Sequence, residues 1–177
     1  LPIYKKATKI RVQQDLGLNI DPKAILTSYM GRHSSQKGAG LMAKEIRALL
    51  DRDPRIQLVV GGEISAGDDQ ARKLKEVIEA LEKDPRYQGR VRGLLRFMDN
   101  EDILKVQLAS DLFFMPSDYE PSGLMQLEAL AAGTSVIAHR VGGLRATLRD
   151  FDADPEEGTS FLFDDFSPVA LRAAAFR

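Results

Sequence analysis

The sequence predicts an α/β fold, a Rossmann-like parallel sheet with helices on both of its faces. Short, continuous apolar segments recur along the chain, which is typical of strands buried on both sides. Between them lie longer segments whose apolar residues follow helical spacing, and this alternation indicates a parallel sheet with crossover helices. The chain has 177 residues, 44% of them hydrophobic, which suits one domain with a substantial core.

The first half of the chain begins with a short basic stretch. Residues 1–8 are expected to form a linker that enters a first helix at about residues 7–16. The strands expected in this half span residues 24–30, 56–60 and 90–95. The helices expected between them span residues 38–51 and 68–83. In the second of these helices Leu74, Ile78 and Leu81 lie on one apolar stripe, of the kind that covers a sheet.

The second half continues the alternation with shorter elements. The expected strands span residues 112–115, 135–138 and 161–163. The expected helices span residues 103–108, 124–132 and 169 onward. Pro116 ends a strand, because proline has no N–H to donate within a sheet, and Gly133 ends a helix. Parallel sheets bind ligands beyond the carboxyl ends of their strands, so function is expected in the loops that follow the strands.

The composition argues against several classes of function. The net charge of −1 gives no reason to expect a nucleic acid or an anionic membrane as partner. The lack of cysteine excludes disulfides and thiolate chemistry, and two histidines do not suggest a histidine-rich metal site. No apolar run approaches the roughly 20 residues that a membrane span needs. We therefore expect no metal, no cofactor, no nucleic acid and no membrane.

The two ends of the sequence suggest a piece of a longer protein. The first residue is Leu1 rather than methionine, and no signal-peptide pattern follows it. Residues 170–177 have a helical pattern that stops without a capping residue. We expect residues 1–177 to form a single domain, a fragment of a longer two-domain enzyme.

The first informative loop follows the first expected strand. It spans residues 31–40 and places Arg32 and Lys37 among glycine and hydroxyl residues, directly before a helix. The start of a helix offers free N–H groups and the positive end of its dipole. Two added cations suit a diphosphate, with the arginine as a fork and the lysine as a point charge. The alternative is a glycine-rich loop with two solvated cations.

The second informative loop follows the fourth expected strand. Pro121 disfavours a helical Glu120, so a helix is expected to begin near Ser122 or Gly123. The N–H groups of these two residues and of Leu124 then point out at the edge of the sheet. Gly123 has no side chain to keep a ligand from the backbone. Glu120 lies just outside the helix, where it is able to accept hydrogen bonds from sugar hydroxyls.

A second carboxylate and a third loop complete the candidate set. Glu128 lies eight residues after Glu120, about two helical turns, and is expected on a similar face. The alternative is an acidic first turn that only complements the helix dipole. Gly62 follows the second expected strand, where a plain turn is the simpler interpretation.

Together these loops resemble a known family. Residues 111–148 closely resemble the C-terminal domain of bacterial glycogen synthases and plant starch synthases. The segments that carry this resemblance are Phe113-Phe114-Met115-Pro116-Ser117, Glu120-Pro121-Ser122-Gly123-Leu124, Gln126-Leu127, Gly133-Thr134 and Gly142-Gly143-Leu144. The spacing from Arg32 to Lys37 matches the first strand–helix loop of that family, and the resemblance extends over nearly the whole chain.

The resemblance implies the donor-binding, C-terminal half of a GT-B glycosyltransferase. It implies that Arg32 and Lys37 hold the nucleotide diphosphate and that Glu120 contacts glucosyl hydroxyls, which makes these three the expected catalytic residues. The substrate implied is a nucleotide-diphosphate sugar, ADP-glucose or UDP-glucose, in a retaining transfer of glucose to a growing α-1,4-glucan. The glucan acceptor is expected to bind through a missing N-terminal domain, so this chain alone is expected to be inactive. The implied location is the cytoplasm, or the plastid in a plant.

The resemblance also implies the substrate-binding residues, which are Ser122, Gly123, Leu124, Glu128, Thr134 and Gly62. The N–H groups of Gly123 and Leu124 are expected near the sugar or phosphate, Glu128 near the ribose, and residues 95–99 near the base. The sequence departs from the family at Ser122, where cysteine is usual, and at Glu128, where tyrosine or another residue is usual. It also has His33 where an apolar residue is common. We expect a structural or incidental role for His33, and we expect His139 to be a surface or packing histidine.

Other functions remain open at this point. A retaining transferase with a sucrose-type or lipid-type acceptor is one, because Glu128 is typical of the wider retaining family. A nucleotide-binding module without transfer activity is another, although Glu120 is directed at a sugar. A Rossmann dehydrogenase ranks last, because no Gly-x-Gly-x-x-Gly motif opens the first helix of the sheet.

Overall fold

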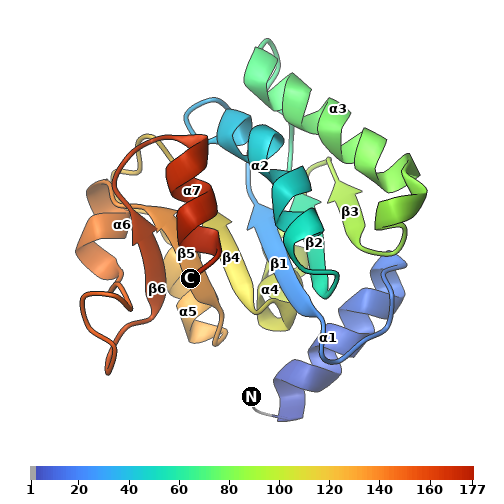
Figure 1. The fold of residues 1–177 in the computed structure, drawn as a ribbon, viewed down its shortest axis with the longest axis horizontal. Helices are drawn as coiled ribbons and strands as arrows, with labels where there is room; N and C mark the ends of the chain where they lie inside the picture. Colours follow the sequence, from blue (N-terminus) through green and yellow to red (C-terminus); the bar gives the residue numbers. More distant parts are fainter. Residues whose placement is uncertain (1–2) are drawn as a thin grey trace.

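The computed structural model describes residues 3–177 and contains one sheet of six parallel strands (Figure 1). The strands are β1 (Ile25–Met30), β2 (Ile56–Gly61), β3 (Val91–Leu94), β4 (Leu112–Met115), β5 (Ser135–His139) and β6 (Ser160–Phe163). The helices are α1 (Ile3–Leu16), α2 (Ala39–Arg52), α3 (Asp69–Lys83), α4 (Asn100–Ala109), α5 (Met125–Ala131), α6 (Gly142–Thr147) and α7 (Pro168–Ala175), with a short 3-10 turn at Pro85–Tyr87. The strand order is β3-β2-β1-β4-β5-β6. The predicted Rossmann-like α/β class is confirmed.

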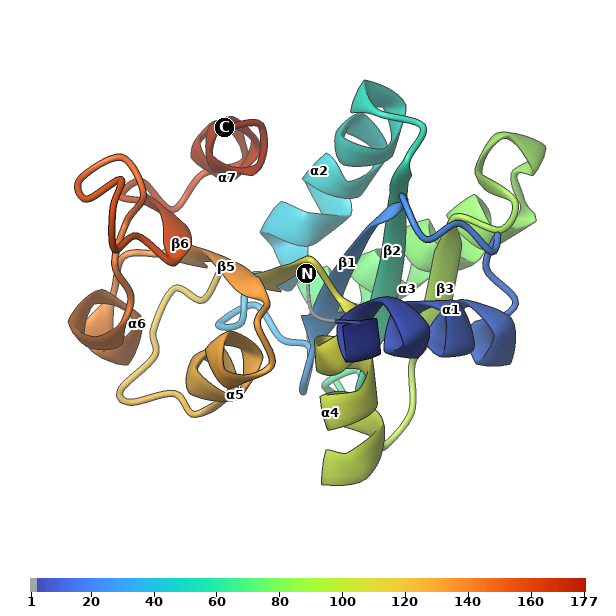
Figure 2. The same cartoon turned by 90° about the horizontal axis from the view of Figure 1, so that it is seen from below.

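Helices cover both faces of the sheet, as the continuous apolar strands predict. Figure 2 shows α2 and α7 on one side of the sheet and α1, α4 and α5 on the other. The core beneath α2 and α3 contains Met42, Ile46, Leu58, Leu74 and Ile78. The core on the opposite face contains Val12, Leu26, Val106, Phe113 and Ala129. The strands are thus buried on two sides, which is why they lack the polar alternation of a half-exposed sheet.

The strand order places a crevice between β1 and β4. β1 pairs with β2 on one side and with β4 on the other. The chain leaves β1 toward α2 and leaves β4 toward α5, and these two helices lie on opposite faces of the sheet (Figure 2). Neighbouring strands whose helices diverge in this way leave an opening beyond their carboxyl ends, where α/β sheets bind ligands.

The expected linker at residues 1–8 is wrong for residues 3–8, because α1 begins at Ile3; residues 1 and 2 lie outside the described residues. Lys5 is buried and donates to the carbonyl oxygen of Ala132 at 3.0 Å and to the hydroxyl of Thr134 at 2.7 Å. Lys9 is also buried and lies 2.5 Å from the carboxylate of Asp111. The basic residues that suggested a solvated linker therefore anchor α1 to the sheet.

The other boundaries shift by a few residues for local reasons. α4 begins at Asn100, earlier than expected, because the side chain of Asp99 accepts a hydrogen bond from the N–H of Asp102 at 2.8 Å and caps the helix. α5 begins at Met125 rather than at residue 122 or 123, because Gly123 has a φ of +66°, outside the helical range. Within residues 3–177, no helix has the length and apolar character that crossing a membrane requires.

Candidate functional site

Two loops meet beyond the carboxyl ends of β1 and β4. The N–H of Asp118 donates to the carbonyl oxygen of Gln36 at 2.8 Å, and the side-chain amide of Gln36 donates to the carbonyl oxygen of Tyr119 at 3.1 Å. Gly38 has a φ of +81°, and a Cβ at this position would collide with the carbonyl oxygen of Pro116. The close approach of the two loops therefore depends on hydrogen bonds between them and on a glycine at residue 38.

This approach brings together Lys37 and Glu120, which come from different loops. The Nζ atom of Lys37 lies 2.5 Å from Oε2 of Glu120. The Glu120 side chain is 8% exposed, whereas that of Lys37 is 35% exposed. The hydroxyl of Ser117 donates to the same Oε2 atom at 3.2 Å. A buried carboxylate is thus held by one cation and one hydroxyl, while the ammonium group still reaches solvent.

The backbone at Glu120 is fixed by the start of α6. The N–H of Gly143 donates to the carbonyl oxygen of Glu120 at 2.8 Å. A Cβ on Gly142 would collide with that carbonyl oxygen, and a Cβ on Gly143 would collide with the carbonyl oxygen of Ser122. The glycine pair therefore packs closely against residues 120–122 and holds the backbone of Glu120 in place.

Arg32 adds a second cation at the mouth of the crevice. Its side chain is exposed, and it has no ion-pair partner within residues 3–177. Arg32, Lys37 and Ser117 line a pocket of about 70 Å³ together with Met125, the first residue of α5. Both cations therefore line the same pocket as Ser117, which belongs to the loop that carries Glu120.

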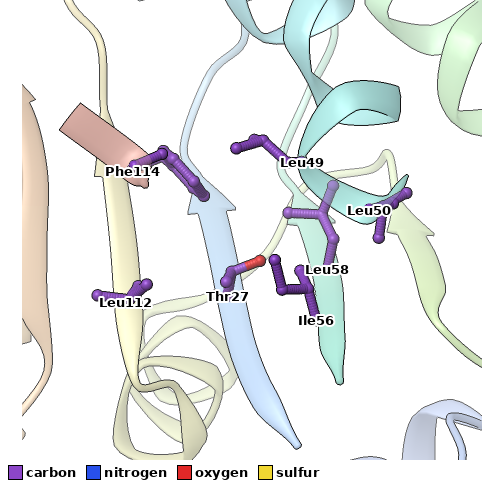
Figure 3. A pocket seen from close by; sticks show the side chains of 8 residues that line it. Thr27, Leu49, Leu50, Ile56, Leu58, Leu112 and Phe114 are labelled. Atoms are coloured by element: carbon purple, nitrogen blue, oxygen red, sulfur yellow. The ribbon is translucent and has the colours of Figure 1, made fainter. Parts of the chain in front are cut away.

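A separate apolar cavity lies between the sheet and α2 (Figure 3). Its lining includes Thr27, Leu50, Leu58 and Phe114 and no charged side chain, and its volume is about 20 Å³. This space suffices for about one water molecule. Its lining offers no charged group to a diphosphate, whereas the crevice carries two cations, so the crevice is the candidate site.

The loop before α5 presents backbone rather than side chains. Ser122 and Leu124 are exposed, and Gly123 adopts a φ of +66°. The side-chain amide of Gln126 donates to the carbonyl oxygens of Ser122 and Gly123 at 3.0 and 3.1 Å. Within the described residues, the N–H groups of Ser122, Gly123 and Leu124 donate to no protein acceptor. These groups therefore remain free to donate to a ligand, and their predicted contact with a sugar or phosphate stays a prediction.

Glu128 lies on α5, and the helical relationship expected between it and Glu120 is wrong. Glu120 precedes the helix by five residues, because Pro121 and the left-handed Gly123 keep this segment out of the helix. Glu120 is buried and paired, whereas Glu128 is exposed and has no ion-pair partner within residues 3–177. The two carboxylates therefore occupy different environments.

Thr134 does not lie at the crevice. It precedes β5, at the opposite edge of the sheet from the carboxyl ends, and its side chain is buried. Its hydroxyl accepts from Lys5 at 2.7 Å and lies 2.7 Å from the carbonyl oxygen of Gln107. We therefore correct the predicted substrate-binding role: the buried hydroxyl of Thr134 is occupied by hydrogen bonds to α1 and to the C-terminal end of α4.

Gly62 lies beside the crevice, but it faces protein backbone. It has a φ of +122°, and a Cβ there would collide with the carbonyl oxygen of Gly31. Its N–H donates to the carbonyl oxygen of Leu94 at 3.0 Å. The close approach that a glycine permits here is therefore between the loops after β1 and β2, and this contact supports the position of Arg32.

Both histidines are buried, and of the two roles expected for His139 the structure shows the packing one. The His33 ring packs against Tyr29 with 4.6 Å between ring centroids, and burial lowers its pKa from 6.5 to about 4. Both His33 ring nitrogens lack a hydrogen-bond partner within the described residues. The ring nitrogens of His139 lie 2.8 Å from the carbonyl oxygen of Ser117 and 3.1 Å from that of Asp164. His139 therefore supports the loop that carries Glu120.

Three residues that shape the site were not predicted from the sequence. Tyr29 is buried and donates from its hydroxyl to the carbonyl oxygen of Lys37 at 2.9 Å. Ser117 contacts the carboxylate, and Gln126 holds the loop before α5. Ser117 and Gln126 lie in the segments that carry the family resemblance, and each of the three residues has a polar group near the end of an apolar strand or the start of a helix.

Comparison with known proteins agrees with this geometry. The family model described as glycosyl transferases group 1 matches residues 12–175. The glycogen synthase of Anaeromyxobacter dehalogenans is 34% identical over 173 residues, which cover 98% of this chain and 34% of the relative. The solved catalytic domain of starch synthase IV from Arabidopsis thaliana, bound to ADP and acarbose, has a TM-score of 0.83 and 26% identity over 98% of this chain and 34% of that one.

A third similar protein is a sucrose-phosphate synthase. The solved sucrose-phosphate synthase of Thermosynechococcus elongatus has a TM-score of 0.67 and 29% identity, covering 99% of this chain and 39% of that one. The chain thus spans roughly a third of the length of its relatives. The fold is that of a GT-B glycosyltransferase domain, and the chain belongs to the glycosyl transferases group 1 family.

Proposed function

We propose that this chain binds the nucleotide-sugar donor, ADP-glucose or UDP-glucose, for retaining transfer of glucose to a growing α-1,4-glucan. The observation that carries the proposal is the contact between Lys37 and Glu120 in the crevice between β1 and β4. It puts a cation suited to phosphate next to a carboxylate suited to sugar hydroxyls. The family match and the similarity to glycogen and starch synthases support the same donor chemistry.

In this proposal the two cations act on the leaving group. When the bond between glucose and phosphate breaks, negative charge grows on the nucleoside diphosphate. Arg32 is exposed and Lys37 is partly exposed at the same pocket, so both are able to reach a diphosphate. Fixed positive charge at the place where negative charge develops lowers the barrier. The two side chains supply this charge in the proposal, without a metal ion or other cofactor.

The remaining groups orient the sugar and the nucleoside. Glu120 accepts hydrogen bonds from glucosyl hydroxyls, and the free N–H groups of Gly123 and Leu124 bind the sugar or a phosphate oxygen. Glu128, which is exposed on α5, contacts the ribose. The glucan acceptor binds through a second domain in the parent enzyme, so the isolated chain turns over very slowly. A cytoplasmic or plastid location stays a prediction.

The test is a calorimetric titration of the chain with ADP, UDP, GDP and their glucose conjugates. Lys37→Ala is expected to weaken binding by at least about tenfold, because it removes a charge that contacts phosphate directly. Lys44→Ala is the matched control, since Lys44 is an exposed cation on α2 with no ion-pair partner within residues 3–177. Equal affinities for the two variants would contradict the proposal, and the preferred nucleotide identifies the base.

A transferase with a different acceptor is the second candidate. The similarity to sucrose-phosphate synthase and the carboxylate at Glu128 favour it. The donor site is the same in both cases, so titration of this chain does not separate them. An assay of the parent enzyme with a glucan and with fructose 6-phosphate as competing acceptors does, because only one acceptor is expected to receive glucose. Product with neither acceptor would contradict both of these assignments and would leave a lipid-type acceptor or a binding module without transfer activity.

A further inference from the structure

The ion pair between Lys37 and Glu120 joins two groups that the proposed donor needs separately. Their side-chain atoms are 2.5 Å apart. On the function proposed above, on which this inference rests, a diphosphate attracts the ammonium group of Lys37 while glucosyl hydroxyls donate to the carboxylate of Glu120. The carboxylate of Glu120 therefore competes with the diphosphate for the ammonium group of Lys37.

The backbones of both residues are held without this ion pair. Tyr29 donates to the carbonyl oxygen of Lys37 at 2.9 Å, and Gly143 donates to that of Glu120 at 2.8 Å. The N–H of Asp118 also joins the two loops through its bond to residue 36. A change of partner thus requires only the Lys37 side chain to move, because it is 35% exposed while that of Glu120 is 8% exposed.

The free-energy cost of moving Lys37 from Glu120 to a phosphate differs between a nucleotide sugar and a bare nucleoside diphosphate. When Lys37 turns to a phosphate, the carboxylate of Glu120 keeps one hydrogen bond, from Ser117 at 3.2 Å. A buried carboxylate that loses its cation is strongly disfavoured. A glucosyl group offers new hydroxyl donors to that carboxylate, whereas a bare nucleoside diphosphate offers none. The nucleotide sugar therefore compensates for breaking the ion pair, and the nucleoside diphosphate does not.

We propose that Glu120 is an internal competitor of the diphosphate, which makes the site select the nucleotide sugar over the bare nucleoside diphosphate. Glu120 thereby discriminates donor from product, in addition to touching the sugar. After glucose has been transferred, Lys37 returns to Glu120 and the nucleoside diphosphate is released. The ion pair serves both specificity and product release.

The test compares Glu120→Gln with the wild-type chain by calorimetric titration, using ADP, UDP and their glucose conjugates. The substitution keeps the size of the side chain and removes its charge, so Lys37 is free for phosphate. The bare nucleoside diphosphate is expected to bind about tenfold more tightly to the variant than to wild type. The affinity gained from the glucosyl group is expected to fall from at least about tenfold in wild type to near unity.

Two further variants serve as controls for the Glu120→Gln titration. Asp118→Asn removes the same charge from an exposed residue of the same loop that has no ion-pair partner within residues 3–177. It is expected to leave the ratio of the two affinities unchanged. Glu120→Asp keeps the charge but shortens the side chain, so its ratio is expected to lie between those of wild type and Glu120→Gln. This graded variant also decides the matter if Glu120→Gln does not fold.

The outcomes separate the two proposals. If wild type binds the nucleotides and Glu120→Gln binds the bare nucleoside diphosphate no more tightly, the competitor role is wrong while the donor-site function stands. A tightening of equal size in Asp118→Asn also overturns it, because general electrostatics then explain the effect. If the wild-type chain binds no nucleotide, the proposed function fails, and the inference fails with it.

Discussion

The hydroxyl of Tyr29, at the end of β1, donates a hydrogen bond to the backbone carbonyl oxygen of Lys37 across a distance of 2.9 Å. Tyr29 itself is buried in the sheet. Burial raises the pKa of Tyr29 well above its ordinary value, so the hydroxyl keeps its proton through the alkaline range. The rigid sheet thus fixes the backbone of the residue whose side chain is proposed to hold the diphosphate.

Tyr29→Phe is expected to weaken nucleotide binding several-fold and to lower the free energy of unfolding by about 1 to 3 kcal/mol, because the Lys37 carbonyl loses its donor. The matched control is Tyr87→Phe. Tyr87 is equally buried, and its hydroxyl donates to Asp51 at 2.6 Å, far from the crevice. The control is expected to lose stability and keep its nucleotide affinity. Equal affinities in both variants would show that Tyr29 does not position Lys37.

Gly38→Ala is expected to damage both stability and binding. A left-handed alanine costs about 1 to 2 kcal/mol, and the collision with Pro116 costs about 1 to 3 kcal/mol more. Gly133→Ala is the control, because Gly133 has a φ of +70° and open space around its Cβ position. Gly133→Ala is expected to lose only the stability that a left-handed alanine costs, and to bind nucleotide with the wild-type affinity. Chemical denaturation and titration of both variants measure the difference, and equal losses of stability would rule out the collision.

The stability of the folded chain is expected to fall in acid through His33. Its pKa is about 4 in the folded state, lowered by burial from 6.5. The unfolded state therefore binds the proton first, so stability is complete above about pH 6.5 and is lost as the pH falls toward 4. The loss from this group alone reaches up to about 3 kcal/mol.

His33→Leu is expected to remove this part of the pH dependence. Leucine has no ring nitrogens to leave without a hydrogen-bond partner, so the variant is also expected to be at least as stable at neutral pH. Chemical denaturation of wild type and variant between pH 7 and pH 4 measures the effect. Parallel stability curves for the two proteins would show that His33 does not titrate in this way.

Thr134→Val is expected to lower stability without changing nucleotide affinity. The substitution removes the hydroxyl that accepts a hydrogen bond from the buried Lys5 at 2.7 Å, at a cost of about 1 to 3 kcal/mol. Thr134→Ser restores the hydroxyl and is expected to recover most of the loss. A lower affinity in Thr134→Val, measured under conditions where it is fully folded, would return Thr134 to the list of substrate-binding residues.

The amino-acid sequence by itself determined the class of fold and predicted that the candidate residues lie in loops that follow strands. Continuous apolar strands such as β1 are recognisable because both of their faces are buried, and parallel strands place their following loops at one edge of the sheet. The residue types at Arg32, Lys37 and Glu120, together with the family resemblance, predict a site that binds phosphate and sugar. Periodicity was less informative at the ends of elements, as α1 shows, because two buried lysines resemble a solvated basic stretch.

Only the tertiary structure decided which candidates meet. Lys37 and Glu120 are 83 residues apart, and their ion pair exists because β1 and β4 are neighbours in the sheet. Thr134 lies away from the site because it precedes β5, whereas the site lies beyond the carboxyl ends of β1 and β4. Distances of this kind depend on strand order and on close contacts such as that of Gly38 with Pro116. Local sequence patterns do not predict these distances, because the distances result from packing between segments that are far apart along the chain.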